Sequence, residues 1–148
     1  MPWRIVLLIL LLAGSTLRGP AAAFDPAHLD RLLRTHRCRG CDLTGADLGD
    51  ADLKRAFLLK ADLRNARLEG ADLYRACLIG AKLDRADLRG AYLERADLSW
   101  ATLEDADLKR AYLRGARLKD ADLTGADLDG ADLFEADTTD AEWGKKGG

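Results

Sequence analysis

The 148-residue chain has only 6% aromatic residues, three cysteines and two histidines. Both histidines, His28 and His36, precede the regular part of the sequence. It contains no glycine-rich phosphate loop, no nucleophile elbow and no set of zinc ligands. We therefore expect no enzyme activity, no cofactor and no bound metal. The net charge is −2 with acids and bases interspersed, which points to no nucleic-acid partner.

Long apolar runs are also lacking, with one exception at the N-terminus. An apolar run from Ile5 to Ala13 follows a single arginine and is followed by small residues that end at Ala23. This layout predicts a secretory signal peptide over residues 1–23, cleaved after Ala23. A membrane anchor is the alternative, but a spanning helix needs about 20 apolar residues. We expect a periplasmic or secreted protein with no membrane insertion after cleavage.

The next segment, residues 24–35, has the features of a short helix. Asp25 can act as the N-cap, with Pro26 at the first helical position. Leu29, Leu32 and Leu33 are spaced to share one face. Because a repeat structure exposes an apolar end, we predict that this helix caps the first coil.

From there the sequence repeats every five residues. Alanine recurs from Ala46 to Ala141 and leucine from Leu43 to Leu133. Five residues advance an α-helix by roughly 500°, so the apolar stripe would drift around it. In a flat strand an odd spacing alternates between faces. A short extended piece followed by a corner puts every alanine and leucine inside, which predicts a solenoid.

The motif A-D-L-x-x, as in "ADLTG" at 121–125 and "ADLDG" at 126–130, resembles the signature of the pentapeptide repeat family over residues 36–143. The opening "CRGCDLTGADL" is similar to the start of many members. The resemblance implies an all-β fold, a right-handed quadrilateral β-helix with four pentapeptides per coil. The chain would form about five coils, with residues 144–148 as a flexible tail and Trp143 closing the C-terminal apolar end. The expected core ladder includes Leu43, Leu63, Leu83, Leu103 and Leu123.

Aspartate precedes many of these leucines at an outward position. Beside a turn, its carboxylate can accept a backbone N–H bond, which is a structural role. The alternative is calcium, since twenty residues per coil would place Asp87, Asp107 and Asp127 in one column. Arg89, Lys109 and Arg110 could neutralise that column instead.

The cysteines leave two questions open. Cys38 and Cys41 should both point inward in the first coil, either as a disulfide or as two free core thiols. Cys77 falls at an outward position, where it could link two chains or remain a free thiol.

The four outer sides differ in character. The sides that begin at 41 and 46 each carry a net charge of −3, whereas the side that begins at 51 (the Ala51 side) is neutral. The Ala51 side and the next one (the Ala56 side) place aromatic, apolar and arginine residues outward, as interface hot spots do. The predicted partner-binding residues are Arg55, Phe57, Leu59, Tyr74, Arg75, Ile79, Tyr92, Arg95, Trp100 and Tyr112.

The leading interpretation is a non-catalytic, exported scaffold that binds a protein partner, or a second copy as a homodimer, through its outer surface. Some members of the family that this chain resembles imitate DNA and act on type II topoisomerases. That activity requires a cytosolic, strongly acidic protein, which the leader and the mixed charge argue against. A purely structural envelope protein is the third interpretation.

Overall fold

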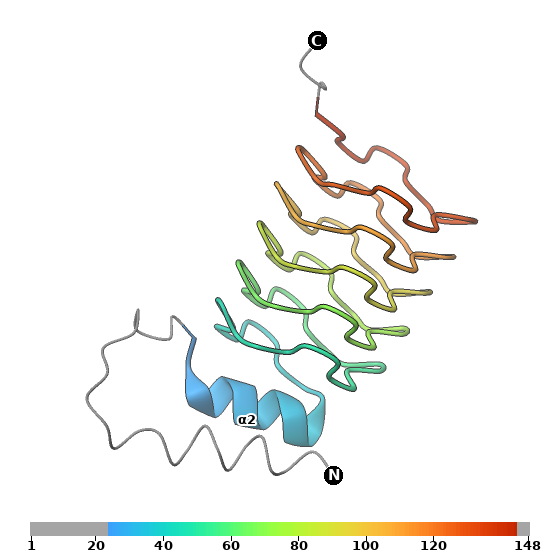
Figure 1. Ribbon diagram of the computed structural model, residues 1–148. Coiled ribbons are helices and arrows are strands. Elements are labelled where there is room, and N and C mark those ends of the chain that lie inside the picture. Colours follow the sequence, from blue (N-terminus) through green and yellow to red (C-terminus); the bar gives the residue numbers. More distant parts are fainter. Residues whose placement is uncertain (1–23, 145–148) are drawn as a thin grey trace.

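The computed structural model describes residues 24–144. They form a stack of coils with helix α2 (Pro26–Thr35) at its N-terminal end (Figure 1). The predicted leader, 1–23, and positions 145–148 of the predicted tail lie outside the described residues. Within 24–144, no helix has the length and apolar character needed to cross a membrane.

Each turn of the coil takes twenty residues. Parallel bridges join residues twenty apart through the stack, from Arg37–Phe57 to Asp122–Glu142. The register is set by bonds such as Leu43 N–H to the Asp62 carbonyl oxygen at 2.8 Å and Asp62 N–H to the Cys41 carbonyl oxygen at 2.8 Å. Neighbouring coils are therefore paired like parallel strands, and Figure 1 shows them stacked one above another.

The extended pieces are very short. Within 24–144 each bridge involves a single residue on either side, so no continuous strand forms. The reason is the corner after every leucine: Ala46 N–H donates back to the Leu43 carbonyl oxygen at 3.0 Å. The second residue after each leucine is left-handed, as at Arg75 with φ of 57°. The β structure expected from the sequence is thus made of isolated bridges between coils.

The interior is a ladder of leucine and alanine. The leucines expected in the ladder are at most 1% exposed, and they are Leu43, Leu63, Leu83, Leu103 and Leu123. Alanines such as Ala61 and Ala81 are equally buried, two residues before the leucine on each side. Full burial of one leucine contributes roughly 1.5–3 kcal/mol, so the stacked ladder is the main source of stability.

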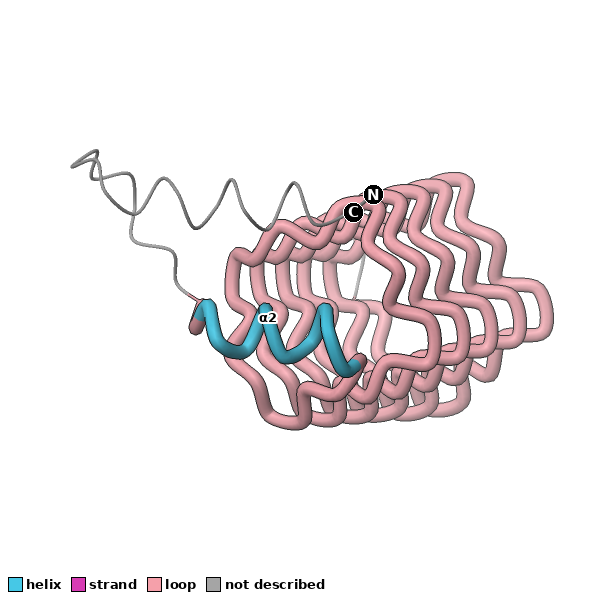
Figure 2. The backbone as a smooth tube through the Cα atoms, turned by 90° about the horizontal axis from the view of Figure 1, so that it is seen from below, coloured by secondary structure: helices cyan, strands magenta, loops and turns pink. Residues whose placement is uncertain are grey.

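Helix α2 begins and ends at identifiable caps. The Asp25 carboxylate accepts the Ala27 N–H at 2.9 Å, and His36 ends the helix in the left-handed region with φ of 54°. Leu29 and Leu32 are buried in the same core as the coils. Leu33 is 36% exposed, so only two of the three leucines expected to cover the coil do so. Figure 2 shows α2 lying across the end of the stack.

The C-terminal end is different, because no helix of the described chain covers it. Trp143 is 43% exposed, and Leu128 and Leu133 are only partly buried. The expectation that Trp143 closes this end is therefore wrong. A single indole at the chain's last described turn is too small to cover four sides of a coil.

Candidate functional site: the outer surface and the cap

The apolar side chains expected to bind a partner lie together on the Ala56 side. Phe57 and Cys77 form a bridge pair one coil apart, and Lys60 N–H donates to the Ile79 carbonyl oxygen at 2.9 Å. Phe57 is 40% exposed, while Leu59 and Ile79 are half-buried. We call Phe57, Leu59 and Ile79 the apolar strip. Leu59 and Ile79 occupy the same position on neighbouring coils, and Phe57 lies two residues before Leu59 on the same side.

A column of three arginines runs along the adjoining corner. Arg55 N–H donates to the Tyr74 carbonyl oxygen at 2.8 Å, and Arg75 N–H to that of Glu94 at 3.0 Å, which places Arg55, Arg75 and Arg95 on successive coils. All three are exposed and left-handed, with φ from 56° to 58°. We call them the arginine column.

The arginine column has no counter-ion among residues 24–144. The Arg75 guanidinium makes a cation–π contact, 5.3 Å from the centre of the Tyr74 ring. Some basic groups elsewhere are paired: Lys54 Nζ lies 2.9 Å from the Asp72 carboxylate, and Arg89 Nη2 lies 2.7 Å from that of Asp87. The column therefore presents free positive charge beside the apolar strip.

The remaining predicted residues belong neither to the arginine column nor to the apolar strip. Tyr92 and Tyr112 stack at 5.0 Å with their planes 4° apart, each 44% exposed, on the Ala51 side. Trp100 is 63% exposed, at a corner of the Ala56 side with φ of 62°. The structure thus divides the ten predicted residues into an arginine column with Tyr74, an apolar strip, a tyrosine stack and a single tryptophan.

One surface contact was missed from the sequence. The Arg114 guanidinium lies 4.6 Å from the centre of the Phe134 ring, on the Ala51 side. Their spacing of twenty residues is one coil, and that signal could have found the pair. It extends the aromatic and arginine character of this side toward the C-terminal end.

The outward aspartates have the structural role expected of them. In each such turn the carboxylate accepts the N–H of the residue two positions later, as the Asp42 carboxylate accepts the Thr44 N–H at 3.1 Å. Where arginine follows, it also bonds the carboxylate: the Arg64 side chain lowers the pKa of Asp62, and Arg89 lowers the pKa of Asp87. Within 24–144 no group of three or more His, Cys, Asp or Glu residues is arranged to hold a metal ion.

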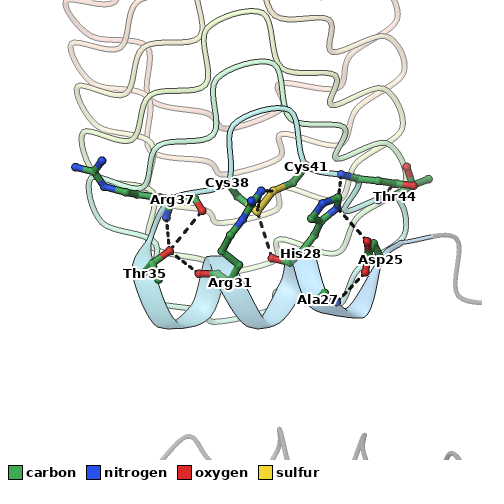
Figure 3. The surroundings of a disulfide bond; sticks show 10 residues. Asp25, Ala27, His28, Arg31, Thr35, Arg37, Cys38, Cys41 and Thr44 are labelled. Carbon is green, nitrogen blue, oxygen red and sulfur yellow. Dashed lines mark hydrogen bonds and ion pairs between the residues drawn. A yellow bond between two sulfur atoms is a disulfide. The ribbon is translucent and has the colours of Figure 1, made fainter.

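The first coil contains a disulfide between Cys38 and Cys41. Figure 3 shows α2 passing beside it. The Arg31 Nη2 lies 2.7 Å from Cys41 Sγ, and His28 Nδ1 accepts the Asp42 N–H at 3.1 Å. Cys77 is free and half-buried. These contacts attach the helix to the first coil.

A family model for pentapeptide repeats matches residues 41–78, 71–110 and 103–137, with eight copies of the repeat. The chain belongs to the pentapeptide repeat family. This membership confirms the resemblance drawn from the A-D-L-x-x motif, and it implies a right-handed quadrilateral β-helix. Proteins of the pentapeptide repeat family are generally non-catalytic repeat scaffolds.

Solved structures of the family resemble this chain. A pentapeptide repeat protein from the cyanobacterium Cyanothece 51142 is 30% identical, covering 79% of this chain and 97% of its own, with a TM-score of 0.50. One from the Arabidopsis thaliana thylakoid lumen is 32% identical, covering 72% and 68%, with a TM-score of 0.52. QnrB1, a plasmid-mediated fluoroquinolone resistance protein, is 19% identical over 74% and 75%, and its TM-score of 0.34 carries no functional argument. A comparison with curated proteins found no significant match.

Proposed function

We propose that this protein is an exported, non-catalytic β-helical scaffold that binds a protein partner at the corner formed by the arginine column and the apolar strip. The observation that carries the proposal is the arginine column itself. Three like charges one coil apart, about 4.8 Å, repel one another unless a counter-charge is supplied. Among residues 24–144 none is supplied, and carboxylates on a partner would provide it.

The apolar strip supports the same surface. Isolated exposed apolar residues are ordinary, whereas a contiguous patch beside arginine is typical of a contact surface. Phe57 is exposed, and Leu59 and Ile79 are half-buried on the next positions of the same side. A partner with an acidic edge and an apolar ridge fits both features. The acidic sides of a second copy are one such edge, so self-association is an outcome of the test.

Export is supported by two observations. Residues 1–23 have the layout of a signal peptide, and the first coil holds a Cys38–Cys41 disulfide, a bond that persists in oxidising compartments. The protein's place would then be the periplasm or the exterior. Mass spectrometry of the protein from the exported fraction should find a chain that begins at Phe24. A chain that retains residues 1–23 in the cytosol would contradict export.

The binding proposal is tested by the triple variant Phe57→Ser, Leu59→Ser and Ile79→Ser. The parent and each variant are crosslinked to their neighbours in the exported fraction of the native cells. The oligomeric state of each protein is measured by sedimentation. The control is Lys82→Ser, Arg85→Ser and Thr124→Ser, three outward positions on the side that begins at 41, and it leaves every carboxylate of that acidic side in place. Loss of the partner or dimer from the first variant alone supports the proposal.

The proposal is contradicted if the crosslinked proteins and the oligomeric state are the same for the parent, the triple variant and the control. In that case this corner does not bind the partner. A circular dichroism melt of each variant shows that the fold is kept. A second variant, Arg55→Ala, Arg75→Ala and Arg95→Ala, should weaken binding most at low salt, because exposed charges are screened at high salt.

A further inference from the structure

The C-terminal end of the stack exposes its interior. We define the C-terminal end surface as Ala126, Leu128, Ala131, Leu133 and Trp143. These leucines are partly buried, whereas Leu123 one side earlier is 1% exposed. Leu128 and Trp143 line an open hollow of about 750 Å³. Apolar surface and a groove therefore coincide at this end.

The same end presents unused hydrogen-bond donors. In the preceding coil, Leu118 N–H donates to the Asp137 carbonyl oxygen at 2.7 Å and Leu123 N–H to that of Glu142 at 2.7 Å. Among residues 24–144 the N–H groups of Leu133 and Thr138 find no backbone acceptor. Unpaired donors at an open coil edge are satisfied by water or by a partner's acceptors.

The charged residues of the chain segment that forms the C-terminal end surface are all acidic. Residues 120–144 contain nine acidic residues and no basic one. The opposite end of the stack has the reverse character, since residues 31–39 contain four arginines and no acid. The C-terminal end is thus both apolar and strongly acidic, and a fitting partner is apolar on one face and basic around it.

Charge and composition limit which molecules could bind the C-terminal end surface. Residues 145–148 are two lysines and two glycines, which offer no apolar side chain for the hollow. A second copy bound through the same end would bring nine acidic residues against nine, which is repulsive. A second copy bound head to tail would match this end in charge, but it would present the outer face of α2, whose one exposed leucine is Leu33, and would bring little apolar surface to the hollow.

The molecule itself shows what covers an open coil of this kind. At the N-terminal end, α2 places Leu29 and Leu32 in the core. Its Arg31 bonds the coil's disulfide, and the ring of His28 accepts the Asp42 N–H of the coil edge. A helix thus buries the leucines and satisfies an edge donor at the same time.

We propose that the C-terminal end surface binds a basic amphipathic helix of a partner protein, in the way that α2 covers the N-terminal end. This surface lies apart from the arginine column, so it is a second binding site beyond the proposed function. The helix would place apolar residues over Leu128 and Leu133 and basic residues against the surrounding carboxylates.

The probe is a labelled peptide with the sequence of residues 24–37 and the change Asp30→Lys, which makes it basic. Its binding to the full chain is measured by fluorescence anisotropy. The control peptide carries Leu29→Ser and Leu32→Ser in addition and has the same charge. We expect saturable binding of the first peptide, about tenfold or more weaker binding of the control, and weakening by about tenfold from 50 to 500 mM salt.

Variants of the chain locate the site. Leu128→Ser with Trp143→Ser should weaken peptide binding by about tenfold or more, since both side chains line the hollow. Asp129→Asn, Glu135→Gln and Asp140→Asn change exposed carboxylates, leave the core intact, and should reduce both affinity and salt dependence. The triple variant of the apolar strip should bind the peptide unchanged, which separates this site from the other.

Three results would overturn the proposal. These are no saturable binding, equal binding of the two peptides, or binding that the end-surface variants leave unaltered. A stable dimer that the end-surface variants dissolve would instead assign the surface to a second copy, and the helix proposal would be wrong.

Discussion

Arg31 of helix α2 donates a guanidinium N–H to Sγ of Cys41, with Nη2 2.7 Å from the sulfur, and so joins the helix to the disulfide of the first coil. The Cys38–Cys41 bond spans three residues of sequence, at one corner of the coil. Helix, disulfide and first coil therefore form one unit at the N-terminal end (Figure 3).

Reduction of the disulfide should destabilise this unit without removing core volume. Closing so short a loop restricts the unfolded chain by about 2 kcal/mol in the chain-entropy model. Urea unfolding with and without dithiothreitol measures the loss. A Cys38→Ser, Cys41→Ser variant should no longer respond to the reductant, whereas Cys77→Ser, at the free cysteine, should respond like the parent. An unchanged unfolding midpoint in the parent would contradict the stabilising role.

The leucine ladder should be most sensitive in the middle of the stack. Leu83 is fully buried, so Leu83→Ala leaves a cavity and should lower the free energy of unfolding by about 2–5 kcal/mol. Leu133 at the open end is only partly buried, so Leu133→Ala should lower it by about 1 kcal/mol. Chemical denaturation compares the two, with Arg85→Ala as the surface control. Equal losses at both leucines would mean that the C-terminal end is covered in solution.

The tyrosine stack should contribute a measurable coupling. The rings of Tyr92 and Tyr112 are parallel within 4° at 5.0 Å, and such pairs contribute about 0.5–1.5 kcal/mol beyond their buried area. A double-mutant cycle of Tyr92→Ala and Tyr112→Ala should return a coupling in this range. A double-mutant cycle of Tyr74→Ala and Tyr112→Ala is the comparison. The effects of these two changes on the free energy of unfolding should be additive. A coupling near zero for the stacked pair would show that the rings do not interact in solution.

Stability should fall in acid through the outward aspartates. The pKa of Asp87 is lowered, chiefly by its hydrogen bond with Arg89, and that of Asp62 by Arg64. A carboxyl whose folded pKa is lowered stabilises the protein fully above its unfolded pKa and loses that contribution as pH falls through the folded value. The free energy of unfolding should therefore be level above about pH 5 and decline below about pH 4.

The variant Asp87→Asn should decline less steeply than the parent across that acid range. Asp129→Asn is the control, since the exposed carboxylate of Asp129 forms no ion pair within residues 24–144. Urea unfolding at pH 7 and at pH 3 is sufficient for the comparison. If the acid dependence of Asp87→Asn equals that of the parent, the Asp87–Arg89 bond does not stabilise the fold.

The spacing of alanine and leucine was enough to predict the solenoid, because only a chain that turns every five residues keeps both inside. Asp25 and Pro26 were enough to predict the start of the helix, since caps are local. The turn role of the aspartates followed from the same local logic. The resemblance supplied the family and with it the coil of four pentapeptides.

The sequence predicted which residues share a column on the surface, but not which of their charges form ion pairs. Sorting residues by twenty placed Arg55, Arg75 and Arg95 in one column, but the sequence could not say that the nearby Asp72 carboxylate is bound to another cation. The Asp72 carboxylate lies 2.9 Å from Lys54 Nζ and forms no ion pair with the column. Which cation reaches which carboxylate depends on rotamers across coils.

The sequence by itself determined the inside of this protein: a period of five fixes which residues face the core, because any other register would bury charge. The tertiary structure alone decided the two ends. Leu33 is 36% exposed, because the way in which α2 packs on the first coil decides which of its leucines are covered. Trp143 leaves Leu128 partly exposed because one side chain cannot cover an end that a helix covers at the other side.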